Sequence, residues 1–380
     1  MPAPHTAPRS GTWIEIEGTR CYAVPAEGGS GPGLLVLDGV GGLDAATQAW
    51  CDRFAGDGYD VLAATAATPV DPVLAALRSR AAPGAGLAVV ATGAAADVAA
   101  WLGAGGAVAA VVVHGLTPGL PAALARCACP CAVQLAAPDL EGGAALSAVR
   151  GLLGTLPRLR LYEYPGCGTR FFQRGDAAFE PHAASLAHTR TLGTVRPAIG
   201  PHYDLARLLY EHLRYEFVTH DPDATMGTMV EAPYVNHVPT MTGGVGHDML
   251  KRFYKYHFIP KIPQERRSIY LSETIGPDTV VLEFVTTFTH DVEIDYMLPG
   301  IAPTGKEVRI PTVLIAKFHG DKLYNEHIYW DQASVLAQLG LIDPKGLPMA
   351  GVAEALKMLD QSRPANELMA NWKESEGKPI

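Results

Sequence analysis

Short apolar runs alternate with alanine-rich amphipathic stretches through the first half of the chain. The apolar runs are rich in leucine or β-branched residues and predict buried strands at 33–39, 59–65, 86–92, 107–115, 131–137 and 158–165. The amphipathic stretches predict helices at 45–58, 72–81, 94–103 and 176–195. Strands that alternate with helices in this way indicate a parallel, doubly wound α/β sheet.

The second half has a different order of elements. Amphipathic helices are predicted first, at 203–221 and 247–261. Long strands joined by short turns follow, at 268–276, 279–297 and 307–323. A last strand starts at 323 and ends at Asp331, where a helical pattern begins. Helices followed by a run of long strands predict an α+β domain with a curved antiparallel sheet.

Composition divides the chain in the same place. No lysine occurs before Lys251, and nine of the thirteen histidines lie in the C-terminal half. A chain of 380 residues is long enough to form two domains. We therefore place domains at 1–196 and 200–345, followed by a tail at 346–380 that is either loosely ordered or wraps a partner subunit. The tail contains one predicted helix, at 352–362.

Charge and hydropathy exclude some partners. The formal net charge of −9 disfavours nucleic acid, whose phosphates require a basic surface. No uninterrupted apolar run reaches the roughly 18–20 residues of a membrane span, so we expect no membrane partner. The N-terminal MPAPHTAPRSG shows no signal-peptide pattern and is expected to be a short disordered lead.

Six cysteines are present, and three of them form the cluster CACPC at 127–131. A zinc site would require further cysteine or histidine ligands at suitable spacing, and none lies close by in the sequence. The cysteines are therefore predicted to be buried free thiols in a reducing cytoplasm, with no metal.

The segment GLLVLDGVGGLDAATQAWCDRFAGDGYDVLAATAA, at 33–67, resembles the opening strand, helix and second strand of a dienelactone hydrolase, an α/β-hydrolase-fold enzyme. The likeness covers roughly residues 10–195. The fold implies a nucleophile on a sharp turn between a strand and a helix. The family pattern there is Gly-x-Cys-x-Gly-Gly, whereas this chain has ATGAAA at 91–96, with Gly93 in place of the thiol.

The other members of the family's catalytic triad are also incomplete. Thr169, in YPGCGTRFF, takes the place of the expected histidine, and only the acid is retained, as Asp139. Cys167 lies on the wrong loop to replace the nucleophile, and His114 is expected to be a packed or capping histidine. Because a triad requires all three groups in mutual reach, this domain is predicted to be a non-catalytic scaffold.

Three segments of the second half, at 234–254, 286–331 and 332–343, resemble the SnoaL-like branch of the nuclear transport factor 2-like fold, which includes polyketide cyclases. The resemblance implies helices packed into a strongly curved sheet, forming a cone with an apolar pocket. It also implies a homodimer formed through the outer face of the sheet. In this family an Asp on the last strand serves as general acid/base, and by motif that residue is Asp331. We expect no cofactor.

Alternation places Asn325, His327, Tyr329 and Asp331 on one face of the last strand, and Glu326, Ile328 and Trp330 on the other. If the Asp331 face is concave, a carboxylate, a phenol and an imidazole converge on the pocket. Which face is concave stays open at this stage. The candidate catalytic residues are Asp331, His237, His327 and Tyr329. The candidate substrate-binding residues are Tyr234, Asn236, His290, Trp330 and Met297.

Simpler interpretations of these residues remain. Asp331 precedes a predicted helix and could be its N-cap, and His327 could be a core or interface histidine. A metal site from His237, His290, Asp291 and Glu293 is conceivable, but no signature such as His-Glu-x-x-His is present.

The sequence thus predicts an acid/base enzyme for a small, largely apolar carbonyl compound. A cyclase, isomerase, lyase or water-activating enzyme would fit. One alternative is a non-catalytic small-molecule-binding or assembly protein. A second is an ester or lactone hydrolase acting through the first domain.

Overall fold

Residues 11–380 are described by a computed structural model, and they form two units that divide between Tyr203 and Asp204. Each unit has a sheet of its own. The predicted N-terminal lead lies, apart from Gly11, outside the described residues. No helix within residues 11–380 is long and apolar enough to cross a membrane.

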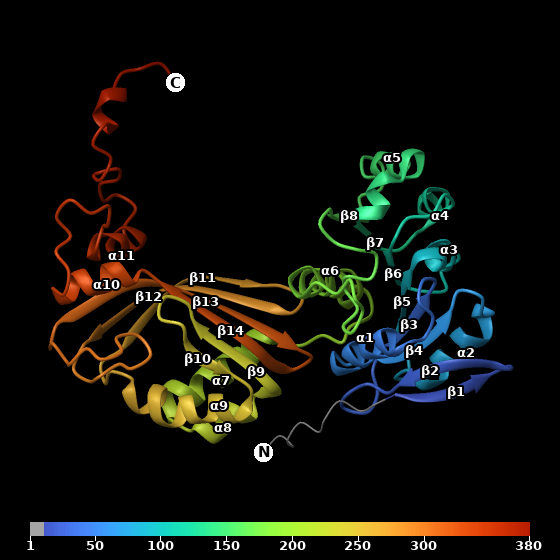
Figure 1. The fold of residues 1–380 in the computed structure, drawn as a ribbon, viewed down its shortest axis with the longest axis horizontal. Helices are drawn as coiled ribbons and strands as arrows, with labels where there is room; N and C mark the ends of the chain where they lie inside the picture. The colour runs from blue at the N-terminus through green and yellow to red at the C-terminus, as the bar shows by residue number, and fades with distance from the viewer. Residues whose placement is uncertain (1–10) are drawn as a thin grey trace. The chain divides into compact units, whose positions relative to one another are not determined.

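The N-terminal unit contains an eight-stranded sheet in the order β1-β2-β4-β3-β5-β6-β7-β8 (Figure 1). The strands are β1 (Thr12–Ile16), β2 (Thr19–Val24), β3 (Gly33–Asp38), β4 (Asp60–Thr65), β5 (Leu87–Thr92), β6 (Ala110–His114), β7 (Cys131–Ala136) and β8 (Leu159–Tyr164). Pairing is parallel from β4 through β3 to β8, whereas β2 runs antiparallel to both β1 and β4.

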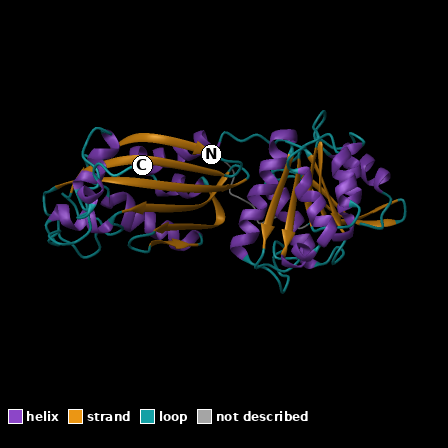
Figure 2. Ribbon diagram, turned by 90° about the horizontal axis from the view of Figure 1, so that it is seen from above, coloured by secondary structure: helices purple, strands orange, loops and turns teal. Residues whose placement is uncertain are grey.

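Helices cover both faces of this sheet (Figure 2). They are α1 (Ala45–Gly56), α2 (Val70–Arg80), α3 (Ala96–Ala104), α4 (Leu120–Arg126), α5 (Gly143–Leu152) and α6 (Pro181–Ile199). The double cover explains the continuous apolar runs, because a parallel strand between two helical layers has no solvent face. Every residue of β3, β5, β6 and β7 is buried. The predicted doubly wound α/β class is confirmed.

The C-terminal unit contains a six-stranded sheet in the order β10-β9-β14-β13-β12-β11. The strands are β9 (Met229–His237), β10 (Thr242–Val245), β11 (Arg267–Ile275), β12 (Thr279–Thr289), β13 (Glu307–His319) and β14 (Lys322–Trp330). All pairs are antiparallel except β9 with β14. The strand predicted at 279–297 ends at Thr289, and a loop follows it.

Helices α7 (Leu205–Arg214), α8 (Pro222–Gly227) and α9 (His247–Phe253) lie together on one side of this sheet (Figure 1). Two of them continue into π-helical turns, α7 at Tyr215–Thr219 and α9 at Tyr254–Phe258. The predicted α+β cone is confirmed as a fold, with the pocket between these helices and the sheet.

The end of the chain is also helical. Helix α10 (Gln332–Leu339) begins at its N-cap Asp331 and ends at Gly340, whose φ of 73° lies in the left-handed region that favours glycine. Helix α11 (Val352–Leu359) follows in the region predicted to be the tail. Both helices pack against β13, and Ala355 of α11 is fully buried, so this part of the tail belongs to the C-terminal unit.

Candidate active site in the C-terminal cone

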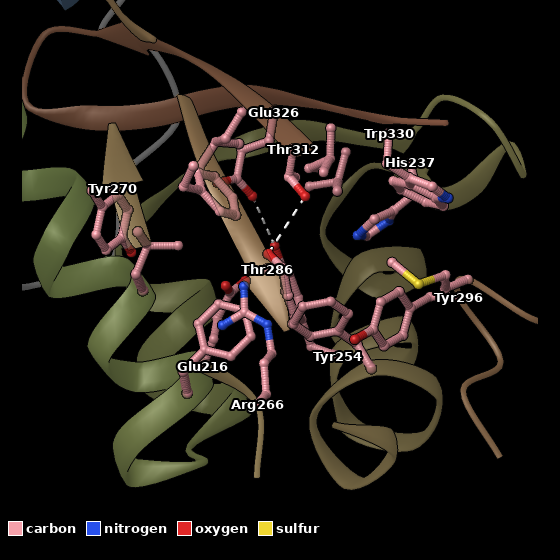
Figure 3. Close-up of a pocket in the computed structure, with 18 residues that line it drawn as sticks. Glu216, His237, Tyr254, Arg266, Tyr270, Thr286, Tyr296, Thr312, Glu326 and Trp330 are labelled. Carbon is pink, nitrogen blue, oxygen red and sulfur yellow. Dashed lines mark hydrogen bonds between the residues drawn. The ribbon is translucent and has the colours of Figure 1, made fainter. Parts of the chain in front are cut away.

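A cavity opens between the sheet and the helices of the C-terminal unit (Figure 3). It offers about 80 Å³ to the centres of water-sized molecules, and a single water needs roughly 10–15 Å³ on this measure. The aromatic side chains in its walls are Phe217, Tyr254, Phe258, Tyr270, Phe284, Tyr296 and Trp330. An apolar enclosure with a few polar groups is the usual form of a small-molecule site.

The register of the sheet decides which side chains reach this cavity. Glu326 of β14 pairs with Val235 of β9, and Ile328 pairs with His237. Directly paired residues point to the same face of a sheet. All four line the cavity, and so does Trp330 at the end of β14. The inner face of β14 is therefore the one that carries Glu326.

The face that carries Asp331 is the outer one, so the placement expected for Asp331, His327 and Tyr329 is wrong. Tyr329 is 41% exposed, and neither it nor His327 lines the cavity. The exposed Asp331 accepts hydrogen bonds from the backbone N–H of Ala333 (2.9 Å) and from the hydroxyl of Ser334 (2.6 Å). It is the N-cap of α10, which is the simpler of the two interpretations.

Two of the expected substrate-binding residues share that outer face. Asn236 pairs with His327, and Tyr234 pairs with Asn325. The Tyr234 ring packs edge-on against His327, with ring centroids 5.3 Å apart. The expectation that Tyr234 and Asn236 line the pocket is therefore wrong, because alternation turns them away when His237 points inward.

His290 also lies away from the cavity, contrary to expectation. It is fully buried, and its Nδ1 lies 3.2 Å from the hydroxyl of Thr304. Glu293 instead forms an ion pair with Lys261, at 3.2 Å. His290 and Glu293 thus have other contacts, and neither lines the cavity that contains His237.

Three predicted residues do line the cavity: His237, Met297 and Trp330. His237 is 4% exposed, and its Nδ1 lies 3.3 Å from the carbonyl oxygen of Thr242. A carbonyl can only accept, so Nδ1 donates the hydrogen bond and Nε2 is left as an acceptor. Burial lowers the pKa of His237 to about 4, so the ring is neutral at pH 7.

The strongest concentration of charge in the cone is a buried cluster that the sequence-based prediction missed. His212 Nε2 lies 3.1 Å from Glu216 and 3.5 Å from Glu326. The hydroxyl of Tyr254 donates to Glu326 at 3.3 Å (Figure 3). All four side chains are buried, and Glu216, Glu326 and Tyr254 line the cavity.

Hydrogen bonding fixes how His212 is protonated. The Thr228 hydroxyl donates to the carbonyl of Thr225 (2.7 Å) and lies 2.6 Å from His212 Nδ1. The hydroxyl proton of Thr228 is therefore used in the bond to Thr225, so Nδ1 of His212 must carry a hydrogen and donate it to the Thr228 oxygen. The other ring nitrogen of His212, Nε2, faces the two carboxyl groups, and one proton lies between Nε2 and Glu216, the nearer of the two.

Opposing effects set the pKa values in this cluster. Burial alone would lower the pKa of His212, but the charges of Glu216 and Glu326 outweigh it and raise the pKa to about 10. For Glu216, burial is the larger effect and keeps its pKa above the ordinary value in spite of His212. A carboxyl group whose pKa is raised by burial suits proton transfer near neutral pH.

A signal for this cluster does exist in the sequence. One buried stripe runs along α7 and into the following turn, and it contains Leu205, Leu209, His212 and Glu216. Polar residues within such an apolar stripe are either paired or functional. Glu216 lies on the π-helical turn after α7, and Tyr254 on the one after α9. Such turns occur often at functional sites.

Arg266 adds a positive charge to the cavity wall (Figure 3). Its guanidinium group lies 4.2 Å from the centre of the Phe217 ring. Among the described residues, no carboxylate lies within ion-pair distance of Arg266. The guanidinium is thus available to a negatively charged or carbonyl oxygen of a ligand.

In the N-terminal unit, the turn after β5, where the sequence resemblance implies a nucleophile, carries Gly93. Gly93 follows β5 directly and has a φ of 48°, and a Cβ there would lie 2.5 Å from a methyl carbon of Val40. Asp139 accepts backbone hydrogen bonds from Leu116 (3.1 Å) and Ala136 (2.9 Å), so it braces two loops. His114 is buried with its ring centre 3.9 Å from that of Phe172, and burial lowers its pKa to about 3.

Together, fold and cavity define a two-domain protein in which a doubly wound α/β unit precedes an α+β cone with an enclosed cavity. No protein-family model and no curated protein matches the chain. Among solved structures, a candidate SnoaL-like polyketide cyclase from Jannaschia sp. CCS1 is 16% identical. It covers 38% of this chain and 99% of its own, with a TM-score of 0.29.

Two further solved structures illustrate the two units. A candidate dienelactone hydrolase from Klebsiella pneumoniae is 14% identical over 49% of this chain and 96% of its own, with a TM-score of 0.41. An NTF2-like protein of unknown function from Burkholderia pseudomallei is 14% identical over 36% of this chain and 98% of its own, with a TM-score of 0.29. At these identities the likeness concerns the fold alone.

Proposed function

We propose that the cavity of the C-terminal cone catalyses proton transfer on a small, largely apolar carbonyl compound without a cofactor. The observation that supports this most is the buried pair Glu216 and Glu326 around His212, at the wall of an aromatic cavity. A purely structural role would not require two carboxyl groups to line a space that is open to a ligand.

The chemistry follows from the protonation of these groups. Glu216 would take a proton from the carbon next to the substrate carbonyl and return it later, because a carboxyl group whose pKa is raised by burial is a stronger base than an exposed one. Glu326 and the charged His212 would hold it in position. Positioned proton transfer of this kind contributes roughly 10²–10⁴-fold to the rate.

Arg266 would stabilise the negative charge that develops on the carbonyl oxygen as an enolate forms. His237 would accept a hydrogen bond from a substrate hydroxyl, since its Nε2 has a free lone pair. An enolate is the intermediate shared by aldol cyclisation, isomerisation and elimination. A substrate with a carbonyl group and a hydroxyl or enol group therefore fits the cavity best.

The test is enzymatic deuterium exchange. The full chain is incubated in D₂O with a panel of small cyclic and aryl ketones and 1,3-diketones, and loss of the proton next to the carbonyl is followed by NMR. We expect exchange above the buffer rate for at least one compound, and a drop of about 100-fold or more in Glu216→Gln. Glu231→Gln, at an exposed position of β9, is the matched control and should retain the wild-type rate.

The alternative function, a binding protein, predicts a different result. The enclosed aromatic cavity supports it, because such a space binds an apolar ligand whether or not chemistry follows. The binding function would replace the enzymatic proposal if a ligand changed Trp330 fluorescence equally in the wild type and in Glu216→Gln, and if neither protein catalysed exchange.

A hydrolase function of the first unit is disfavoured by Gly93. The cytoplasm remains the predicted compartment.

A further inference from the structure

Three thiols of the N-terminal unit converge on one point, far along the chain from any residue of the proposed active site. Cys127 follows the last residue of α4, and Cys131 is the first residue of β7. The sulfur of Cys127 lies 3.4 Å from that of Cys129 and 3.1 Å from that of Cys131. All three sulfurs lie within 4.8 Å of one another.

Helix α3 leaves space for these sulfurs at one residue. A Cβ at Gly103 would lie 2.4 Å from the sulfur of Cys127 and 2.9 Å from that of Cys129. Any larger residue would therefore displace the cluster. Cys127 and Cys131 are buried, whereas Cys129 is only half-buried and gives access from solvent.

The three thiols form a convergent set of ligands beside a fixed positive charge. The sulfurs of Cys129 and Cys131 both lie within hydrogen-bond distance of the sulfur of Cys127. Arg158 is held in place because its Nε donates to the carbonyl oxygen of Cys127 at 2.7 Å.

We propose that Cys127, Cys129 and Cys131 bind one soft metal ion in three-coordinate geometry, and that monovalent copper is the ion whose chemistry fits. Soft thiolate ligands select such ions. Sulfur atoms about 2.3 Å from a metal in a trigonal plane lie about 4 Å apart, so the sulfur of Cys127 needs to move away from those of Cys129 and Cys131 by less than about 1 Å. A structural zinc site takes four ligands, and the set formed here by the described residues has three.

Binding is a simple exchange of protons for metal. The three thiols bind M⁺ as thiolates, and one proton leaves for solvent as each of the three metal–sulfur bonds forms. No oxidant or reductant is consumed. The charge of Arg158 offsets part of the negative charge of the complex.

The test is a titration of the reduced, full-length chain with monovalent copper under argon, against a chromophoric copper(I) chelator. We expect one tightly bound copper ion per chain and release of about three protons in weakly buffered solution. Cys129→Ser, at the half-buried position, should weaken binding by at least 100-fold with an unchanged far-UV circular dichroism spectrum. Gly103→Ala should weaken it as well, because the added Cβ occupies the space of two sulfurs.

The matched control is Cys167→Ser, which removes a half-buried thiol outside the cluster and should leave the stoichiometry and affinity unchanged. Equal copper binding in the wild type and Cys129→Ser would overturn the proposal. Rapid formation of a disulfide between Cys127 and Cys131 in copper-free solution, with no copper bound before or after reduction, would overturn it in favour of a redox pair.

Discussion

His212 is the residue on which the proposed chemistry of the cone depends. One ring nitrogen is engaged by Thr228, so the other must share its proton with Glu216 and Glu326. The pKa of His212, raised to about 10 against an ordinary value of 6.5, means that the charged ring stabilises the fold below pH 6.5. That contribution disappears as pH rises through 10. The two carboxyl groups therefore keep their counter-ion over the whole physiological range.

His237 gives the opposite pH dependence, and this can be measured. Its pKa falls from 6.5 in the unfolded chain to about 4 in the folded one, so between these values only the unfolded chain takes up the proton. Acidification from pH 6.5 to 4 should thus cost up to about 3 kcal/mol of the free energy of unfolding. Urea unfolding at pH 7, 5.5 and 4.5 should show a smaller loss in His237→Gln. An identical loss in the two proteins would refute this assignment.

At the scale of elements, strand β14 shows what the sequence could and could not predict. Alternation correctly separates Asn325, His327 and Tyr329 from Glu326, Ile328 and Trp330. Both faces mix polar and apolar residues, so the pattern alone does not tell which face is concave. The answer depends on which face the helices cover, which is a property of tertiary packing.

The same limit explains the missed carboxyl pair. The helical period places Glu216 on the buried stripe of α7, but it does not show that Glu216 meets Glu326 of β14 around His212, because that contact depends on tertiary packing. In the first unit, strands buried on both faces are long apolar runs, so the class of that fold followed from the sequence alone. The half-exposed β1 carries no such run, and the hairpin that it forms with β2 was not predicted.

Asp331 should behave as a helix cap in a stability measurement. Asp331→Ala removes the acceptor for the Ala333 N–H and the Ser334 hydroxyl, and should lower the free energy of unfolding by about 1 kcal/mol. Asp331→Asn retains a carbonyl oxygen that can accept the same bonds, and should remain near the wild-type value. Thermal unfolding of the three proteins tests this. Equal losses in both variants would show that the charge, rather than the cap, matters.

At the scale of the whole molecule, the two units have separate sheets and separate chemistry. The first unit has the doubly wound α/β fold, and Gly93 follows β5 directly, so the proposed catalysis lies in the second unit. A homodimer through the cone remains a prediction. The edge strand β11 exposes Ile269 and Ile275 by more than half, and these side chains would be available to such a contact.

The central claim is that proton transfer occurs at the inner face of the cone rather than at the residue suggested by the family motif. The most direct measurement compares deuterium exchange by the full-length Glu216→Gln and Asp331→Asn variants on the same ketone, with circular dichroism to verify folding. We predict a loss of at least about 100-fold in Glu216→Gln and a rate within about twofold of wild type in Asp331→Asn. Loss of exchange in Asp331→Asn with a normal rate in Glu216→Gln would contradict the account.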